Sequence, residues 1–148
     1  MDLIPRIATT PEELAAFTAQ VKNSGLPFQD LNQANQIRIG YFIEEELVGT
    51  GALEIHDQYG LLRSLSVKFG IRGQSLGSMI TDHLLLLAKE NQLKTVFLLT
   101  ETAHGFFKKK GFIDVTREAV PDQVKASTEF AHVCPTSAVC MQLEISPT

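Results

Sequence analysis

The stretch that decides the fold spans residues 61–99 and reads LLRSLSVKFGIRGQSLGSMITDHLLLLAKENQLKTVFLL. Its two ends, residues 61–67 and 95–99, are short apolar runs that indicate β-strands. Between them the apolar positions recur at helical spacing, which predicts an amphipathic helix over residues 75–90. These positions are Leu76, Met79, Ile80, His83, Leu84 and Leu87. A strand, a helix and a second strand in this order predict a right-handed crossover and one parallel strand pair.

Strand and helix patterns continue on the N-terminal side of this crossover. Thr10, Pro11 and Glu13 are typical of a capping box with proline at the first helical position, so a helix is predicted from there to about Asn23. The polar stretch at residues 29–36 has room for one short helix. The predicted strands are residues 3–7, 37–43 and 47–56. The last of these is separated from the strand at 61–67 by a connection short enough for an antiparallel hairpin.

On the C-terminal side the pattern predicts two further helices and two further strands. They are a helix at 103–109, a strand at 112–115, a helix starting near Pro121 and a strand at 139–145. No repeat or linker divides the chain, so we expect one domain over residues 1–148. The expected fold is α/β (mixed α+β), with a strongly twisted mixed sheet of six or seven strands. Most strands would pair antiparallel, and one crossover would join a parallel pair. Helices would cover both faces of the sheet.

Composition narrows the classes of partner. The chain has 148 residues, of which 44% are hydrophobic and 20% charged, which fits one globular domain. A net charge of -4 argues against nucleic acid or an anionic membrane surface as a partner. No apolar run reaches the length of a membrane span and the N-terminus lacks the layout of a signal peptide, so we expect a cytoplasmic protein. The two cysteines are expected to be free thiols, and their spacing predicts no metal site.

A turn with two glycines precedes the central helix. Small residues at a strand-to-helix turn let main-chain N–H groups converge on a phosphate, and a helix N-terminus adds about half a positive charge. The sequence therefore predicts a pyrophosphate cradle at residues 71–77, which read IRGQSLG. A glycine-containing turn without a ligand explains the same residues equally well.

This turn resembles the signature of the GNAT superfamily of acyl-coenzyme A N-acyltransferases, Arg/Gln-x-x-Gly-x-Gly/Ala after the fourth strand. Arg72, Ser75 and Gly77 occupy its three defined positions, with Ser75 in place of the usual glycine. A second segment, AHGFFKKKGF at residues 103–112, looks like the family's Ala-x-x-Phe-Tyr-x-x-x-Gly-Phe. The resemblance implies a GNAT-like fold, acetyl-CoA as cosubstrate, no metal, and acetyl transfer to the amine of a small molecule.

The resemblance also implies where acetyl-CoA binds. Pantetheine would lie between the strands ending at Val67 and Thr100 and bond to their backbones as an added strand does. The main-chain N–H of Val67 would be the oxyanion donor. The expected cofactor contacts are Leu65, Ser66, Val67, Arg72, Gly73, Gln74, Ser75, Leu76, Gly77, Ser78, Thr100, Phe106, Phe107 and Lys109.

Two positions depart from the family pattern. Phe107 replaces the tyrosine that often protonates the leaving thiolate. Arg63 stands where many members carry a glutamate that activates the amine, four residues before Val67. The planar fork of Arg63 suits a carboxylate or an arsenic oxyanion, so we expect it to clamp a substrate anion beside Ser64; an ion pair with a neighbouring acid is the alternative.

Candidate bases come from the preceding strand. Glu54 and His56 alternate onto one face, and either could act as a base if that face borders the acceptor. Solvated polar residues near a hairpin explain them as well. An amine of low pKa would need no protein base.

Three segments look like the subgroup of these enzymes associated with bacterial arsenic resistance. They are residues 62–67 (LRSLSV), 97–100 (FLLT) and 130–141 (FAHVCPTSAVCM). This resemblance implies a link to arsenic detoxification without naming the acceptor. We expect Cys134 and Ser137 to face Arg63 across the acceptor pocket. The alternative functions are a trivalent-arsenic-binding protein using Cys134 and Cys140, and a non-catalytic acyl-CoA sensor. A monomer and a homodimer are both compatible with the sequence.

Overall fold

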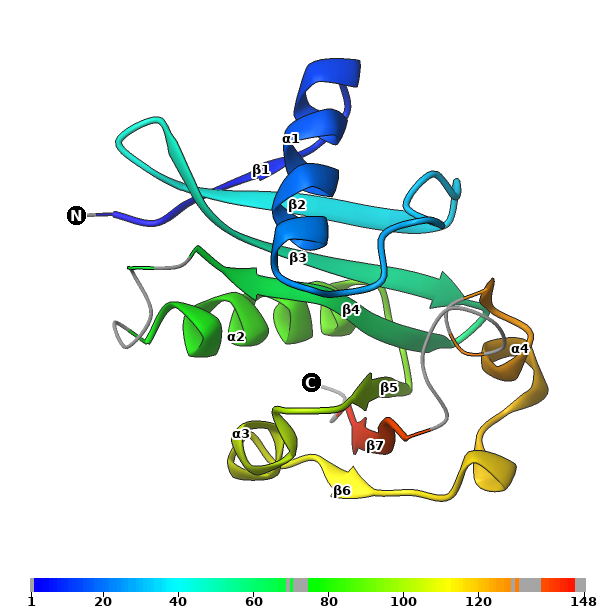
Figure 1. Cartoon of the computed structure of the whole chain (residues 1–148). Helices are drawn as coiled ribbons and strands as arrows, with labels where there is room; N and C mark the ends of the chain where they lie inside the picture. The colour runs from blue at the N-terminus through cyan, green and yellow to red at the C-terminus, as the bar shows by residue number, and fades with distance from the viewer. Residues whose placement is uncertain (1, 69, 71–74, 129, 131–136, 146–148) are drawn as a thin grey trace.

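The computed structural model describes residues 2–68, 70, 75–128, 130 and 137–145. Within them, seven strands form one sheet in the order β1-β2-β3-β4-β5-β7-β6 (Figure 1). The strands are β1 (Ile4–Ile7), β2 (Gln36–Ile43), β3 (Glu46–His56), β4 (Tyr59–Val67), β5 (Thr95–Thr100), β6 (Ile113–Asp114) and β7 (Val139–Glu144). The helices are α1 (Pro11–Asn23), α2 (Leu76–Glu90), α3 (His104–Lys109) and α4 (Asp122–Lys125), with a 3₁₀ turn at Arg117–Ala119.

The predicted fold is confirmed. Only β4 and β5 pair in parallel among the described strands, and the crossover helix α2 joins them. The capping box at the start of α1 is also present, with the Thr10 hydroxyl accepting from the Glu13 N–H and Glu13 Oε1 accepting from the Thr10 N–H.

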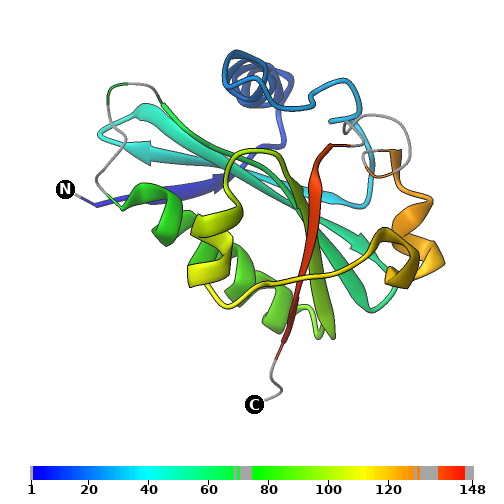
Figure 2. The same ribbon diagram turned by 60° about the horizontal axis from the view of Figure 1, so that its bottom comes forward.

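The helices cover both faces of the sheet, as Figure 2 shows with α1 on one side and α2 and α3 on the other. Alternation along β3 explains this arrangement, because successive residues of a strand point to opposite faces. Ala52 packs with Phe17 and Val21 of α1. A side chain added at Gly51 would instead lie 2.7 Å from Leu84 Cδ1 of α2. Glycine on that face therefore lets α2 approach the sheet closely.

Some predicted boundaries shift. The β3–β4 hairpin is tighter than expected, because Asp57 adopts a φ of 60° and β4 begins at Tyr59. The strand expected at 112–115 is reduced to Ile113–Asp114, and the polar stretch before β2 forms turns and no helix in the described residues. None of these changes alters the order of the elements.

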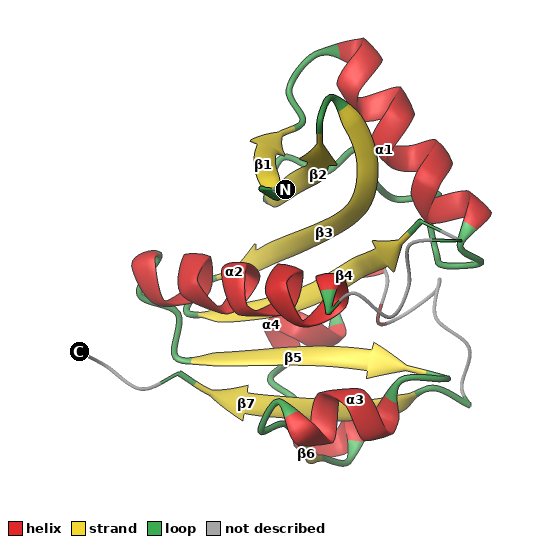
Figure 3. Cartoon of the chain, turned by 90° about the vertical axis from the view of Figure 1, so that its left-hand side faces the viewer, coloured by secondary structure: helices red, strands yellow, loops and turns green. Residues whose placement is uncertain are grey.

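The parallel pair β4–β5 separates after three residues. Tyr59, Gly60 and Leu61 of β4 pair with residues 95–97 of β5, and the pairing recorded for the two strands ends there. β4 is irregular beyond this point: its register with β3 shifts between Thr50 and Ala52, and Ser64 has a left-handed φ of 59°. Figure 3 shows β4 and β5 diverging toward their C-terminal ends. The bulge at Ser64 therefore bends β4 away from β5 and opens the sheet.

Candidate functional site

Two adjoining cavities occupy the opening between β4 and β5. The smaller, of about 230 Å³, is lined by both strand ends and by the segment after α1. The wider, of about 620 Å³, lies against the start of α2 and against α3. Both are lined by Ser24, Leu26, Leu65, Thr102 and Ala103, so they form one continuous cleft. The cleft passes from one side of the separated strands to the other.

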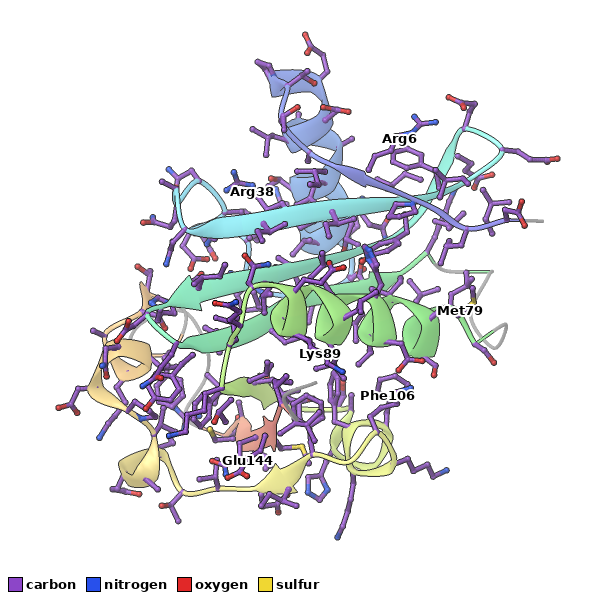
Figure 4. The ribbon with its side chains drawn as sticks, turned by 180° about the vertical axis from the view of Figure 1, so that it is seen from behind. Arg6, Arg38, Met79, Lys89, Phe106 and Glu144 are labelled. Carbon is purple, nitrogen blue, oxygen red and sulfur yellow. The ribbon has the colours of Figure 1, made fainter. Side chains whose placement is uncertain are left out.

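The wider cavity contains most of the expected cofactor contacts that the structure describes. Its lining includes Leu65, Ser66, Val67, Ser75, Leu76, Gly77, Ser78 and Phe106. A Cβ built on Gly77 would lie 3.7 Å from Phe106 Cζ and 3.9 Å from Val67 Cγ2. Figure 4 shows Phe106 on the side of α3 that faces α2. Gly77 thus leaves open the space where the helix N-terminus meets the cleft. Arg72, Gly73 and Gln74 lie outside the described residues.

Ser75 shows why a glycine is usual at its position. It is the N-cap of α2 with φ 61° and ψ 18°, a left-handed conformation that a side chain disfavours. Its hydroxyl makes no capping hydrogen bond. The departure from the family pattern therefore places a side chain in a left-handed conformation and adds a hydroxyl beside the helix N-terminus.

The lysine beside this helix N-terminus is Lys110. Its Nζ donates to Ser78 Oγ at 2.8 Å and pairs with Asp82 Oδ1 at 2.6 Å. Lys109, which we expected at the phosphates, lies exposed in the last turn of α3. Sequence alone could not separate the two, because three lysines follow one another at the end of a very short helix.

Phe107 lines the smaller cavity, where the family's tyrosine was expected. It is buried, with its ring 5.0 Å from that of Phe106 and 5.6 Å from that of Phe112. Thr100 also lines the cavity, and its Oγ1 accepts from the N–H of Ala103 at the start of α3. The hydroxyl of Thr100 thus fixes the turn that leads from β5 into α3.

Arg63 takes a different role from the expected substrate clamp. Its guanidinium donates through Nη1 and Nη2 to the two carboxylate oxygens of Asp30, at 2.5 and 2.6 Å. The side chain of Arg63 is 0% exposed and that of Asp30 is 3% exposed. The fork therefore binds a carboxylate of the protein itself, as in the alternative considered above. Ser64, the neighbouring candidate, does line the smaller cavity, and its carbonyl accepts from Thr50 Oγ1.

Glu54 and His56 extend this buried ion pair and do not line either cavity. Glu54 Oε2 accepts from Gln36 at 2.8 Å and from Arg63 at 3.2 Å, and Oε1 lies 2.6 Å from His56 Nε2. Burial raises the pKa of Glu54, but the hydrogen bonds from His56 and Gln36 and the charge of Arg63 outweigh it, so the pKa lies below its ordinary value. The face of β3 that carries both residues thus borders the Arg63–Asp30 pair and not the acceptor cleft.

The two described residues before β7, Ser137 and Ala138, lie at the wall of the smaller cavity. Ser137 Oγ donates to Glu101 Oε2 at 3.2 Å, and Ala138 lines the smaller cavity. Cys134 lies outside the described residues. Cys140 is buried in β7, and burial raises the pKa of its thiol to about 11, so the thiolate that binds soft metals is disfavoured. This observation weakens the arsenic-binding alternative.

The described residues also bear on metals and membranes. They contain no cluster of three or more His, Cys, Asp or Glu side chains placed to hold a metal ion. In the same part of the chain, no helix has the length and apolar character of a membrane span.

Comparison with known proteins identifies the class that this fold and cleft define. The sequence model of the acetyltransferase (GNAT) domain matches residues 38–114, just over half of the chain. The chain therefore belongs to the GNAT acetyltransferase family, and the resemblance found in the sequence is confirmed at that level.

Individual relatives agree with this assignment. A stretch of 80 residues is 34% identical to an amino-acid acetyltransferase of Mycobacterium tuberculosis (strain ATCC 25618 / H37Rv), covering 53% of this chain and 45% of that protein. The match thus spans less than half the length of that relative.

Solved structures share the fold. N-acetylglutamate synthase from Neisseria gonorrhoeae, complexed with coenzyme A and N-acetyl-glutamate, superposes with a TM-score of 0.79 at 13% identity, over 99% of this chain and 36% of that one. Rv2747 from Mycobacterium tuberculosis, solved in complex with CoA, superposes with a TM-score of 0.73 at 22% identity. The match covers 97% of this chain and 99% of that one. At these identities the likeness is one of fold.

Proposed function

We propose that this chain is an acetyl-CoA-dependent N-acetyltransferase that acetylates the amine of a small molecule. The observation that carries the proposal is the cleft between the separated ends of β4 and β5, which meets the N-terminus of α2 at Gly77. The open space beside Gly77 and Phe106 fits an extended thioester arm whose phosphates reach a helix N-terminus.

Different residues of the cleft would bind the pyrophosphate and the pantetheine of acetyl-CoA. The first turn of α2, with the Ser75 hydroxyl and the ammonium of Lys110 nearby, would hold the pyrophosphate. The main chain at 65–67 and at Thr100 would bond the pantetheine as an added strand, with the N–H of Val67 as the oxyanion donor. Bound acetyl-CoA supplies the acetyl thioester, and the acceptor amine must reach it neutral.

Neither Phe107 nor the two candidate bases on β3 moves a proton in this arrangement. Phe107 has no proton to give, but a thiol of pKa about 8.5 leaves as thiolate at pH 7 for only about 2 kcal/mol. Glu54 and His56 lie away from the cleft lining, so water is the proposed proton acceptor for the amine. A non-catalytic acyl-CoA sensor is the second candidate, since Phe107 removes the usual acid.

The test combines a binding measurement with a turnover measurement. Calorimetric titration with CoA should give saturable binding, and release of thiol from acetyl-CoA should depend on an added amine. Binding without amine-dependent thiol release over amino acids, polyamines and aminoalkyl arsenicals would favour the sensor. Absence of CoA binding would refute the proposal.

A link to arsenic detoxification is a further part of the proposal, supported by the resemblance of residues 130–141. It predicts that expression of the chain raises the arsenic tolerance of an arsenic-sensitive bacterium, and that the Gly77→Gln variant does not. Equal tolerance with both proteins would show that acetyl transfer plays no part. The cytoplasmic location and the choice between monomer and homodimer stay predictions, which cell fractionation and sedimentation can check.

A further inference from the structure

Two charged side chains line the smaller cavity among the described residues, and only one of them faces solvent. Arg63 and Glu101 are these residues. The Arg63 guanidinium is enclosed, bonded to Asp30 through two nitrogens and within 3.2 Å of Glu54 Oε2. A ligand carboxylate that took this fork would leave the buried Asp30 carboxylate without the guanidinium that donates to both its oxygens, at a large cost.

Glu101 has the opposite surroundings. It follows the last residue of β5 at the cleft wall and is exposed. One of its oxygens accepts from Ser137 Oγ at 3.2 Å, which ties the carboxylate to the segment before β7. An ionised carboxylate has about four acceptor sites, so Glu101 retains capacity for further donors. Its charge is therefore presented to whatever enters the smaller cavity.

The rest of the lining, as far as the structure describes it, contains no basic side chain. In the described residues it is apolar, main-chain or hydroxyl in character. An amino-acid acceptor would bring its α-carboxylate close to Glu101, and like charges at short range repel. In the described lining the one cation is Arg63, whose guanidinium is already bonded to Asp30.

We propose that the acceptor is an amine without a carboxylate beside the reacting nitrogen, and that Glu101 selects it by binding a positively charged group. The inference rests on the proposed acetyl transfer and defines its substrate class. It separates this chain from the relative whose name specifies an amino acid, although the two share a family. Glu101 is a specificity-determining residue in this view, since it contacts the acceptor and not the thioester.

The experiment uses pairs of acceptors that differ only by a carboxylate: agmatine against arginine, cadaverine against lysine, and tyramine against tyrosine. Thiol release from saturating acetyl-CoA gives kcat/KM for each. We expect the decarboxylated member of each pair to exceed the amino acid by about tenfold or more, the size of one charge-assisted contact. Glu101→Gln should lower kcat/KM for agmatine and cadaverine about tenfold and narrow the difference within each pair.

Two controls keep this result separate from the proposed function. Glu90→Gln removes a carboxylate at the far end of α2 and should behave as wild type. The dissociation constant of CoA should be the same in all three proteins. Three outcomes would overturn the inference. The amino acids could be turned over faster than the decarboxylated amines, or Glu101→Gln could show the same preference within each pair as wild type. The third outcome is CoA binding without turnover of any amine in the pairs. If the wild-type protein does not bind CoA at all, the proposed function itself is refuted.

Discussion

Asp30 accepts both arms of the Arg63 guanidinium inside the protein, although the two residues lie 33 positions apart. This pair ties the connection between α1 and β2 to the middle of β4. Asp30→Ala should lower the free energy of unfolding by about 3–5 kcal/mol, because it removes the carboxylate that accepts from both arms of a buried guanidinium. Urea unfolding at neutral pH measures the change.

The controls for this prediction use a second ion pair and a double variant. Arg6→Ala breaks the exposed pair with Glu45 and should cost less than about 1 kcal/mol. Asp30→Ala combined with Arg63→Met should recover part of the loss, since no buried charge is then left alone. If Asp30→Ala lowers the free energy of unfolding no more than Arg6→Ala does, the Arg63–Asp30 pair does not have this structural role.

Acid should destabilise the fold through Glu54. Its pKa lies below the ordinary value of 4.5 because the bonds from His56 and Gln36 and the charge of Arg63 outweigh burial. A carboxyl whose pKa is lowered by folding stabilises the protein above its unfolded pKa, and this contribution is lost as the pH falls through the folded pKa. Between about pH 5 and pH 3 the free energy of unfolding should fall less steeply in Glu54→Gln than in wild type. The free energy of unfolding is measured by urea titration at each pH, and the same pH dependence in both proteins would contradict this prediction.

Glycine at position 75 should stabilise the protein. Ser75 holds a left-handed conformation and makes no capping hydrogen bond, so Ser75→Gly removes strain of about 1 kcal/mol. Ser78→Gly is the comparison: it lies within the first turn of α2, where glycine is less favourable than serine by about 0.5 kcal/mol and the bond from Lys110 is lost as well. Denaturant midpoints of the two variants should move in opposite directions, and a decrease in both would show that the left-handed residue is not strained.

Filling the space at Gly77 should abolish CoA binding without unfolding the chain. Alanine fits, because its Cβ meets Phe106 and Val67 at ordinary contact distances, whereas glutamine extends into the wider cavity. Calorimetry should therefore detect CoA binding in Gly77→Ala and none in Gly77→Gln. Thermal unfolding checks that both variants are folded. Undiminished affinity in Gly77→Gln would place the cofactor elsewhere.

Restoring the family's tyrosine should change turnover only slightly. Departure of the thiolate costs about 2 kcal/mol at neutral pH, and Phe107 is already enclosed by Phe106 and Phe112. We expect Phe107→Tyr to alter kcat less than about tenfold, or 1.4 kcal/mol of barrier. A gain of about a hundredfold in steady-state thiol release would mean that the natural protein lacks a needed acid, which would support the sensor.

The fold could be predicted from the sequence because its decisive signals are local. The change from strand to helix period and back within residues 61–99 required a crossover, and the crossover required a parallel pair. The position of Gly77 beside the cleft followed from the same segment, since a strand-to-helix turn places its residues at one edge of the sheet. The bulge at Ser64 has no such signal, because it depends on the fit of β4 against β3.

The side chains of the site were harder to predict because their partners are remote in sequence. Asp30 lies in a connection without periodicity, so the pattern of β4 alone could not reveal that Arg63 is occupied. Glu101 directly follows the apolar run of β5, and the pattern of that run gives no information about the residue after it. Lys110 is distinguished from its neighbours only by the packing of α3 against α2.

The three-residue junction between β4 and β5 divides the sheet into two hydrogen-bonded blocks, β1–β4 and β5–β7. Few backbone bonds couple the blocks, so each is a separate unit of local opening, and the amides at the strand ends should exchange with solvent early. A ligand bonded along both strand ends joins the blocks into one unit. Its binding would then slow amide exchange in strands that it never touches. The two blocks would open together in the ligand-bound protein, whereas each opens by itself in the free protein.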